Sequence, residues 1–264
     1  MFAGKLRVAR SGYAIVGRQA PIPVRLQMKA IFCQMAGSIL LCVRIFIVMK
    51  QTFMRFRDRV EAGRLLAKQL TKYARRSDVL VLALPRGGVP VAFEVAQALH
   101  APLDVYVVRK LGVPGHEELA MGAIASGGVR VLNGSVIESL GIPDASIDAV
   151  AAREFRELQR RERAYRAGRA APDVQGRTVI LVDDGIATGS TMRAAVEALR
   201  QLEAARVVVA TPTAASSTVR EMRPEVDEFV AVIMPEEFYG VGQWYEDFSQ
   251  TTDEEVRALL ERSS

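Results

Sequence analysis

Short runs of mostly apolar residues alternate along the chain with longer segments in which apolar side chains recur every three or four positions. The runs are typical of strands buried on both faces of a parallel sheet, and the longer segments are typical of amphipathic helices. Strands are predicted at 79–84, 103–108, 179–182, 206–210 and 229–233. Helices are predicted at 54–73, 89–100, 192–203 and 216–222. This alternation predicts an α/β fold with a mostly parallel central sheet, helices on both faces and right-handed crossovers.

The pattern changes between the second and third of these strands. Residues 121–126 and 129–132 predict two short strands joined at a glycine pair. A helical insertion is predicted at about 135–170, and its long second helix interleaves charges of opposite sign at helical spacing. Such spacing favours a solvated helix with surface ion pairs over an RNA-binding surface, because acids are nearly as frequent as bases.

Residues 1–53 are predicted to be a basic and apolar extension outside the core. Residues 30–49 are long enough to cross a bilayer, although Gln34 and Arg44 are unfavourable inside one. A weak membrane anchor and a helix at a dimer interface are two interpretations of this segment. A third, which we favour, is that these residues precede the natural start codon.

In that third interpretation translation starts at Met49 or Met54. The folded domain is then predicted to be residues 54–264, with a helical and aromatic C-terminal tail.

The formal net charge of +5 does not indicate nucleic-acid binding. Residues 1–50 contain eight of the 35 Lys and Arg and none of the 30 Asp and Glu, so the remainder has 27 bases against 30 acids. Such a balance lacks the clustered positive charge that a phosphate backbone requires. Both cysteines, Cys33 and Cys42, also lie in the extension. A body without cysteine favours a cytoplasmic location and excludes a disulfide framework.

The strand at 179–182 is followed by two acids, a glycine, and a loop rich in hydroxyls that leads into a helix. Adjacent carboxylates at a strand end require a cation or hydroxyl donors. Backbone N–H groups of a glycine loop and a helix N-terminus favour a phosphate. The combination therefore favours a sugar phosphate over the alternative, a plain strand-to-helix turn with local caps.

At these residues the sequence resembles the type I phosphoribosyltransferases, whose motif has four apolar residues, two acids and a Thr-Gly-x-Thr loop. The resemblance implies that Asp183 and Asp184 hold the ribose hydroxyls, with Mg²⁺ nearby. It also implies that the 5-phosphate is bound by Ala187, Thr188, Gly189, Ser190 and Thr191.

A second anion-binding turn is predicted at Pro85–Gly88, between a strand and a helix. Its glycines permit close approach of the backbone, and Arg86 adds a fixed charge. The alternative is a simple strand-to-helix connection. The resemblance implies that Arg86, Gly87 and Gly88 bind the leaving pyrophosphate.

A mobile lid is predicted over residues 109–118, where glycines flank a proline and charges are frequent. A closing loop would protect a sugar cation from water. Related enzymes carry basic residues near this place, which implies that Arg109 and Lys110 contact pyrophosphate. His116 is a weaker candidate for proton transfer, because a lone loop histidine is usually only solvated.

Aromatic residues gather after the last strand, and Thr252 with Glu255 predicts a capping box that begins a terminal helix. The rings of Trp244 and Tyr245 either stack on a planar acceptor or pin the tail to the body.

The resemblance implies a glycosyltransferase that moves the phosphoribosyl group of phosphoribosyl pyrophosphate to a nitrogen acceptor, with Mg²⁺ as cofactor and a role in nucleotide metabolism. The acceptor stays open: enzymes for 6-oxopurines usually carry an acid where Ala187 stands. A regulatory protein that senses phosphoribosyl pyrophosphate is the alternative. A dinucleotide-dependent oxidoreductase is disfavoured, since no Gly-x-Gly-x-x-Gly follows a strand. A homodimer is possible.

Overall fold

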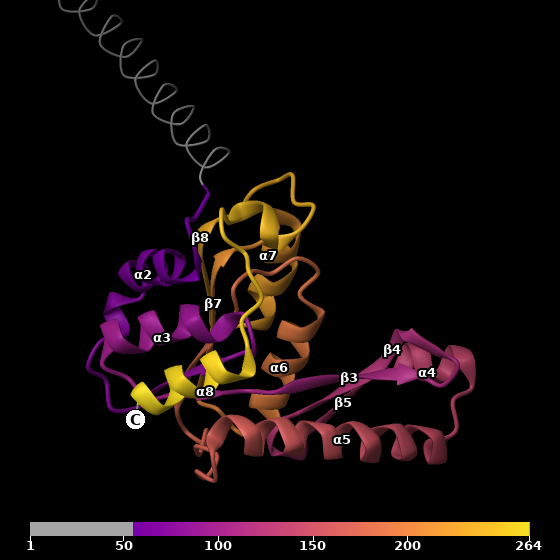
Figure 1. Cartoon of the computed structure of the whole chain (residues 1–264). Helices are drawn as coiled ribbons and strands as arrows, with labels where there is room; N and C mark the ends of the chain where they lie inside the picture. Colours follow the sequence, from indigo (N-terminus) through magenta and orange to yellow (C-terminus); the bar gives the residue numbers. More distant parts are fainter. Residues whose placement is uncertain (1–54, 264) are drawn as a thin grey trace, which may run out of the picture. The chain divides into compact units, whose positions relative to one another are not determined.

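The computed structural model describes residues 55–263 (Figure 1). The chain divides into two units, Met1–Met49 and Lys50–Ser264, and only the second is described below. The predictions for residues 1–53 lie outside the described residues. Within residues 55–263, no helix is long and apolar enough to cross a membrane.

A five-stranded parallel sheet forms the centre of the domain, in the order β2-β1-β6-β7-β8. Each of the five predicted strands is present, with small shifts of its ends. The strands are β1 (Val79–Ala83), β2 (Leu103–Val105), β6 (Thr178–Val182), β7 (Arg206–Thr213) and β8 (Glu228–Ile233). Every residue of β1, β2 and β6 is buried, as expected for strands covered on both faces. The strand that precedes the two acids, β6, is central as predicted.

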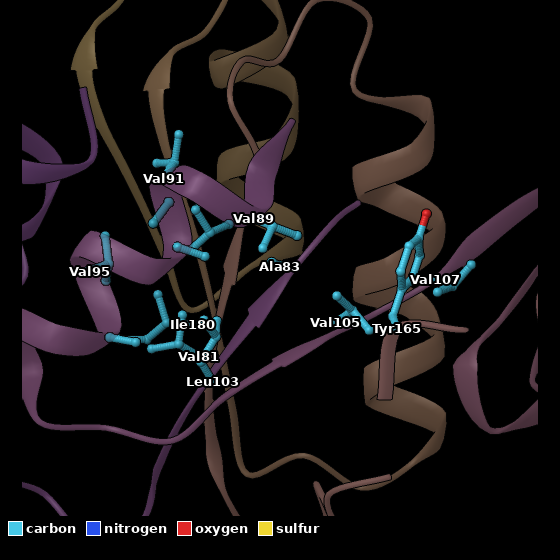
Figure 2. Packing of buried hydrophobic residues seen from close by; sticks show 14 of the residues in the cluster. Val81, Ala83, Val89, Val91, Val95, Leu103, Val105, Val107, Tyr165 and Ile180 are labelled. Atoms are coloured by element: carbon cyan, nitrogen blue, oxygen red, sulfur yellow. The ribbon is translucent and has the colours of Figure 1, made fainter. Parts of the chain in front are cut away.

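Helices cover both faces of this sheet, and alternate residues of each strand face opposite layers. Val81 and Ile180 belong to the cluster that α3 (Gly88–Leu99) completes, together with α2 (Arg59–Gln69) and α8 (Asp253–Arg262). Figure 2 shows this packing against Val89 and Val95 of α3. Leu80 and the residues in register with it face α6 (Ser190–Gln201) and α7 (Ser216–Met222) on the other side.

The first predicted helix is shorter than expected. Asp58 caps α2 by accepting a hydrogen bond from the backbone N–H of Glu61 at 2.8 Å, so the helix begins at Arg59 rather than near residue 54. Phe56 precedes it and pairs with Tyr245 through an isolated parallel bridge. After Gln69 the chain continues into a short 3-10 helix, η1 (Thr71–Tyr73).

Residues 109–118 are not the irregular loop that the sequence predicts, because they form an antiparallel hairpin; their closing over the site stays a prediction. The hairpin consists of β3 (Val108–Val113) and β4 (His116–Ala125), and it turns at Pro114 and Gly115. Gly115 has a φ of +79°, which explains the glycine at the turn. The second predicted strand consequently ends at Val105, and β3 starts a separate sheet.

The third strand of this sheet is β5 (Arg130–Leu132), which pairs with β4 after a turn, η2 (Ser126–Gly128). This confirms the two short strands expected around the glycine pair. Next come α4 (Gly134–Leu140) and α5 (Asp144–Arg166), where a helical insertion is predicted. In Figure 1 the hairpin and α5 run side by side away from the central sheet. The two antiparallel strands therefore pack on the insertion.

The helix α5 is only partly the solvated helix that its charge pattern predicts. Glu157 pairs with Arg160 and Arg161 on its surface, as expected. However, Leu158 is fully buried, and the charged side chains of Glu154 and Arg166 are also buried. Arg166 bridges Asp104 of β2 and Glu162 at 3.0 Å each. One face of α5 therefore belongs to the domain interior.

Candidate active site

The two predicted anion-binding loops follow the neighbouring parallel strands β1 and β6, and they touch each other. A methyl group at Gly87 would overlap Oδ2 of Asp184. A Cβ at Gly88 would lie 2.8 Å from the carbonyl oxygen of Val182 and 3.0 Å from the Cα of Asp183. Both positions therefore require glycine for close packing, and the structure brings the Arg-Gly-Gly turn and the acid pair together.

The loop at residues 187–191 has the form expected of a phosphate cradle. Gly189 has a φ of +74°, and α6 begins directly after it at Ser190. The side chains of Thr188, Ser190 and Thr191 are exposed, and the hydroxyls of Thr188 and Ser190 lie 3.3 Å apart. The first N–H groups of α6 have no partner within the helix, so they are free to bind an anion together with these hydroxyls.

Other segments hold this loop from behind. The hydroxyl of Thr218 on α7 donates to the carbonyl oxygen of Ala187 at 2.5 Å. Arg193 donates from Nη1 to the carbonyl oxygen of Thr188 at 3.1 Å. A side chain at Gly189 would meet Met222 and Thr218 at 2.8 Å. These contacts fix the backbone while the hydroxyls stay open.

The two acids have different surroundings. Asp184 is buried, and its Oδ2 accepts a hydrogen bond from Nε of Arg59 at 2.8 Å. Its carbonyl oxygen accepts one from the hydroxyl of Tyr245 at 2.6 Å. Asp183 is more exposed and uses Oδ1 to accept the backbone N–H of Asp184 at 2.8 Å. Each acid thus has one carboxylate oxygen outside these hydrogen bonds, and Asp183 is the less buried of the two.

Burial raises the pKa of both acids above the usual value for aspartate. For Asp183 the negative charge of Asp184 raises the pKa further, and the shift is large. For Asp184 the positive charge and the hydrogen bond of Arg59 oppose the effect of burial on the pKa. A cationic or hydroxyl-bearing ligand beside Asp183 would stabilise its charged carboxylate and so lower its pKa.

Arg59 is a site residue that the sequence did not indicate. It is the first residue of α2 and lies 125 positions before Asp184. An arginine next to a helix cap is ordinarily a surface residue, so only its spatial position shows the contact. The sequence signal nearest to it is the N-cap Asp58, which fixes where the helix begins and so the position of Arg59 in its first turn.

Arg86 lies at the edge of the loop, and the peptide bond that joins it to Pro85 is cis. Its side chain is about one third exposed, with Nη1 3.9 Å from Oδ1 of Asp253 at the start of α8. The same carboxylate oxygen accepts the hydroxyl of Tyr165 at 2.8 Å. This long contact leaves the guanidinium accessible for an anion.

Arg109 and Lys110, the two basic residues predicted to contact pyrophosphate, lie on opposite sides of β3. Neighbouring residues of a strand face opposite sides. Arg109 faces α5 and donates from Nη2 and Nε to Oε2 of Glu154 at 2.7 and 3.0 Å. Lys110 lines a groove of about 930 Å³ between the hairpin sheet and α6, together with Ser190 and Thr191. Only Lys110 thus shares a groove with the phosphate loop.

Lys110 is itself held within the hairpin. Its Nζ donates to the carbonyl oxygen of Glu118 at 2.7 Å. His116 is exposed where β4 begins at the hairpin turn.

The rings of Trp244 and Tyr245 are buried, which favours the second of the two interpretations of the aromatic tail. They belong to a cluster with Phe56, Ala62 and Ile233. The ring centroids of Phe56 and Tyr245 are 5.4 Å apart. These contacts pin the tail to the start of the domain. The predicted capping box of Thr252 and Glu255 is present at the start of α8.

A phosphoribosyl transferase domain model matches residues 56–242. The chain belongs to this family. It is 49% identical over 208 residues to two proteins of Mycobacterium tuberculosis, which are named "Putative phosphoribosyl transferase MT0597" (strain CDC 1551 / Oshkosh) and "Putative phosphoribosyl transferase Rv0571c" (strain H37Rv). Each match covers 79% of this chain and 47% of the relative, so the chain spans about half the length of these curated relatives.

Among solved structures, TT1426 from Thermus thermophilus is 43% identical, with a TM-score of 0.71. That match covers 80% of this chain and the whole of TT1426. The family membership confirms the resemblance drawn from the central motif, and the parallel sheet with its flanking helices is the fold that the resemblance implies.

Proposed function

We propose that the protein binds phosphoribosyl pyrophosphate and transfers its phosphoribosyl group to a nitrogen acceptor, with release of pyrophosphate. The contact between the Arg-Gly-Gly turn and the acid pair carries this proposal. It brings the proposed pyrophosphate loop against the proposed ribose-binding acids, and the proposed phosphate loop follows these acids directly in the chain. Family membership alone would not show whether this chain still assembles a site that binds the substrate.

Each part of the substrate has a proposed partner. The 5-phosphate lies on the loop from Ala187 to Thr191, where exposed hydroxyls and the N-terminus of α6 converge. Asp183 accepts hydrogen bonds from the ribose hydroxyls. The pyrophosphate lies against Gly87 and Gly88, and Arg86 neutralises part of its charge.

Magnesium is proposed to enter with the substrate. In residues 55–263 no group of three or more His, Cys, Asp or Glu is arranged to hold a metal. Of the acid pair, Asp184 is already paired with Arg59. This donor set fits an ion bound mainly by pyrophosphate and ribose oxygens, as magnesium commonly is in phosphate sites. When bound, the ion would supply positive charge that stabilises the departing pyrophosphate.

The reaction proposed for this site breaks the bond between C1 of the ribose and the pyrophosphate oxygen, and it forms a bond from C1 to the acceptor nitrogen. The residues around the site contribute positioning and electrostatic stabilisation rather than covalent chemistry. Asp183 lies where its negative charge would stabilise a sugar cation. The fixed loops hold both ends of the substrate while C1 moves between them.

The direct test is a pyrophosphate-release assay with phosphoribosyl pyrophosphate, Mg²⁺ and a panel of nucleobases and small amines. We expect release with a member of the panel, and we expect Asp183→Asn to abolish it. Tight binding of phosphoribosyl pyrophosphate without release for any acceptor would favour a sensor. Release by Asp183→Asn at the wild-type rate would contradict the proposed site.

A further inference from the structure

Arg59 and Asp184 form an ion pair that is almost completely shielded from water. The side chain of Arg59 is 11% exposed and that of Asp184 is 12% exposed, with 2.8 Å between Nε and Oδ2. Removal of one partner from a buried pair leaves an uncompensated charge, which is strongly unfavourable. The state of Asp184 therefore depends on an arginine that belongs to a distant segment of the chain.

The same guanidinium connects the acid pair to the C-terminal tail. Its Nη1 donates to the carbonyl oxygen of Ser249 at 2.7 Å. Its Cζ lies 4.1 Å from the ring centroid of Phe248, within the range of a cation–π contact. The hydroxyl of Tyr245, from the same tail, bonds the carbonyl oxygen of Asp184. Arg59 is thus fixed by contacts on several sides.

Arg59 also reaches the second loop. A Cβ at Gly87 would lie 3.3 Å from Nε of Arg59, as well as against Asp184. The guanidinium therefore fills the junction of the Arg-Gly-Gly turn, the acid pair and the tail. A change there would displace both loops that are proposed to hold the substrate.

We propose that Arg59 is a positioning residue of the transferase site. It fixes the Asp184 carboxylate against Gly87, so that the neighbouring Asp183 faces the sugar and the Arg-Gly-Gly turn keeps its place. This inference rests on the proposed function. Arg59 acts through Asp184 and does not itself contact the substrate.

The same helix offers a matched control. Arg64 also belongs to α2 and also forms an ion pair through Nε at 2.8 Å, with Glu94 of α3. Its side chain is 63% exposed, however, and its partner lies outside the site. Replacing Arg64 removes the same positive charge and a similar contact without touching the acid pair.

The experiment compares Arg59→Gln, Arg59→Lys and Arg64→Gln in the full chain. Isothermal titration with phosphoribosyl pyrophosphate and Mg²⁺ measures affinity, and steady-state pyrophosphate release separates kcat from KM. We expect Arg59→Gln to weaken affinity by on the order of 10- to 100-fold, as loss of a supporting residue does in other binding sites. Arg59→Lys should recover part of it, and Arg64→Gln should match the wild type.

A double variant separates positioning from folding. If Arg59→Gln is poorly folded, Arg59→Gln with Asp184→Asn removes the uncompensated charge and should recover thermal stability but not affinity. Equal affinity in Arg59→Gln and Arg64→Gln, with the wild type binding normally, would overturn the role of Arg59 alone. A wild type that does not bind phosphoribosyl pyrophosphate would overturn the proposed function, and with it this role.

Discussion

Gly87 packs its backbone directly on the carboxylate of Asp184, with no room for a side chain between them. These residues are 97 positions apart and belong to two separate motifs. Because β1 and β6 are parallel neighbours, the loops after them meet at one edge of the sheet. The contact joins two separate anion loops into one site.

Gly87→Ala tests this contact. The added methyl group would push the Asp184 carboxylate away, so we expect the affinity for phosphoribosyl pyrophosphate to fall by about 10-fold or more. Gly240→Ala is the control, because a Cβ at Gly240 meets nothing within 4 Å and the backbone of Gly240 is extended. Equal affinity in the two variants, measured by titration calorimetry, would show that the loops tolerate separation.

Arg109→Ala tests the place of the first basic residue of the hairpin. The change removes one of the two cations of the buried Glu154 and leaves Arg153 at 3.1 Å, so we expect the free energy of unfolding to fall by about 1–2 kcal/mol in urea denaturation. The affinity for phosphoribosyl pyrophosphate should stay at the wild-type value. Loss of affinity with unchanged stability would instead support a direct contact between Arg109 and pyrophosphate.

Lys110→Met tests the second basic residue. Lys110 lines the groove that contains Ser190 and Thr191, so its charge should favour an anion there. We expect the affinity for phosphoribosyl pyrophosphate to fall by about 3- to 10-fold, since the side chain is partly solvated. Lys68→Met on the exposed surface of α2 removes the same charge elsewhere and should have no effect. An identical response of the two variants would exclude Lys110 from the binding site.

Tyr73 makes stability depend on pH in the alkaline range. Burial and a 2.5 Å hydrogen bond to Glu228 raise the pKa of its phenol to about 12 in the folded protein, against an ordinary value of about 10. The protonated phenol therefore contributes stability that is complete below pH 10 and is lost as the pH rises to 12. Between pH 9 and 11.5 the wild type should lose about 2 kcal/mol more stability than Tyr73→Phe.

The control for this pH dependence is Tyr239→Phe. Tyr239 is 87% exposed, so the loss of its hydroxyl should leave the packing of the domain unchanged. If Tyr73→Phe and Tyr239→Phe gave parallel curves of unfolding free energy against pH, the proposed coupling of Tyr73 to folding would be wrong.

The sequence predicts the central sheet well because its strands are local apolar runs. Apolar residues 179–182 indicate a buried strand without any knowledge of neighbours, and the acids and glycines that follow have few alternative uses. The helices α3 and α7 are likewise found within one or two residues of their predicted ends. The predicted bounds of a strand or helix are accurate where the residues of that segment alone determine its conformation.

The hairpin was missed because its strands are stabilised by each other and by α5. Residues 109–118 are charged and rich in glycine, which locally resembles a loop. In the structure Gly112 allows the two strands to come close, since a Cβ there would lie 2.7 Å from the carbonyl oxygen of Glu117. The cation of Arg109 meets Glu154 only because a helix 45 residues away packs on the strand. No local pattern contains this information.

Arg59 was missed for the same reason. Its helix was expected, but that prediction rested on the spacing of apolar side chains, which does not indicate the partner of a charged residue. Its partners Asp184 and Ser249 lie 125 and 190 positions further along the chain. Only the fold brings them together.

The most direct test of the proposed site is isothermal titration of the wild type and Asp183→Asn with phosphoribosyl pyrophosphate and Mg²⁺. Asparagine has nearly the same shape as aspartate, so the change removes the charge and leaves the loop intact. We expect saturable binding by the wild type and at least about 10-fold weaker binding by the variant, because ionised groups form the stronger hydrogen bonds to hydroxyls. Absence of binding by the wild type, or equal binding by both proteins, would contradict the assignment of this edge of the sheet as a phosphoribosyl pyrophosphate site.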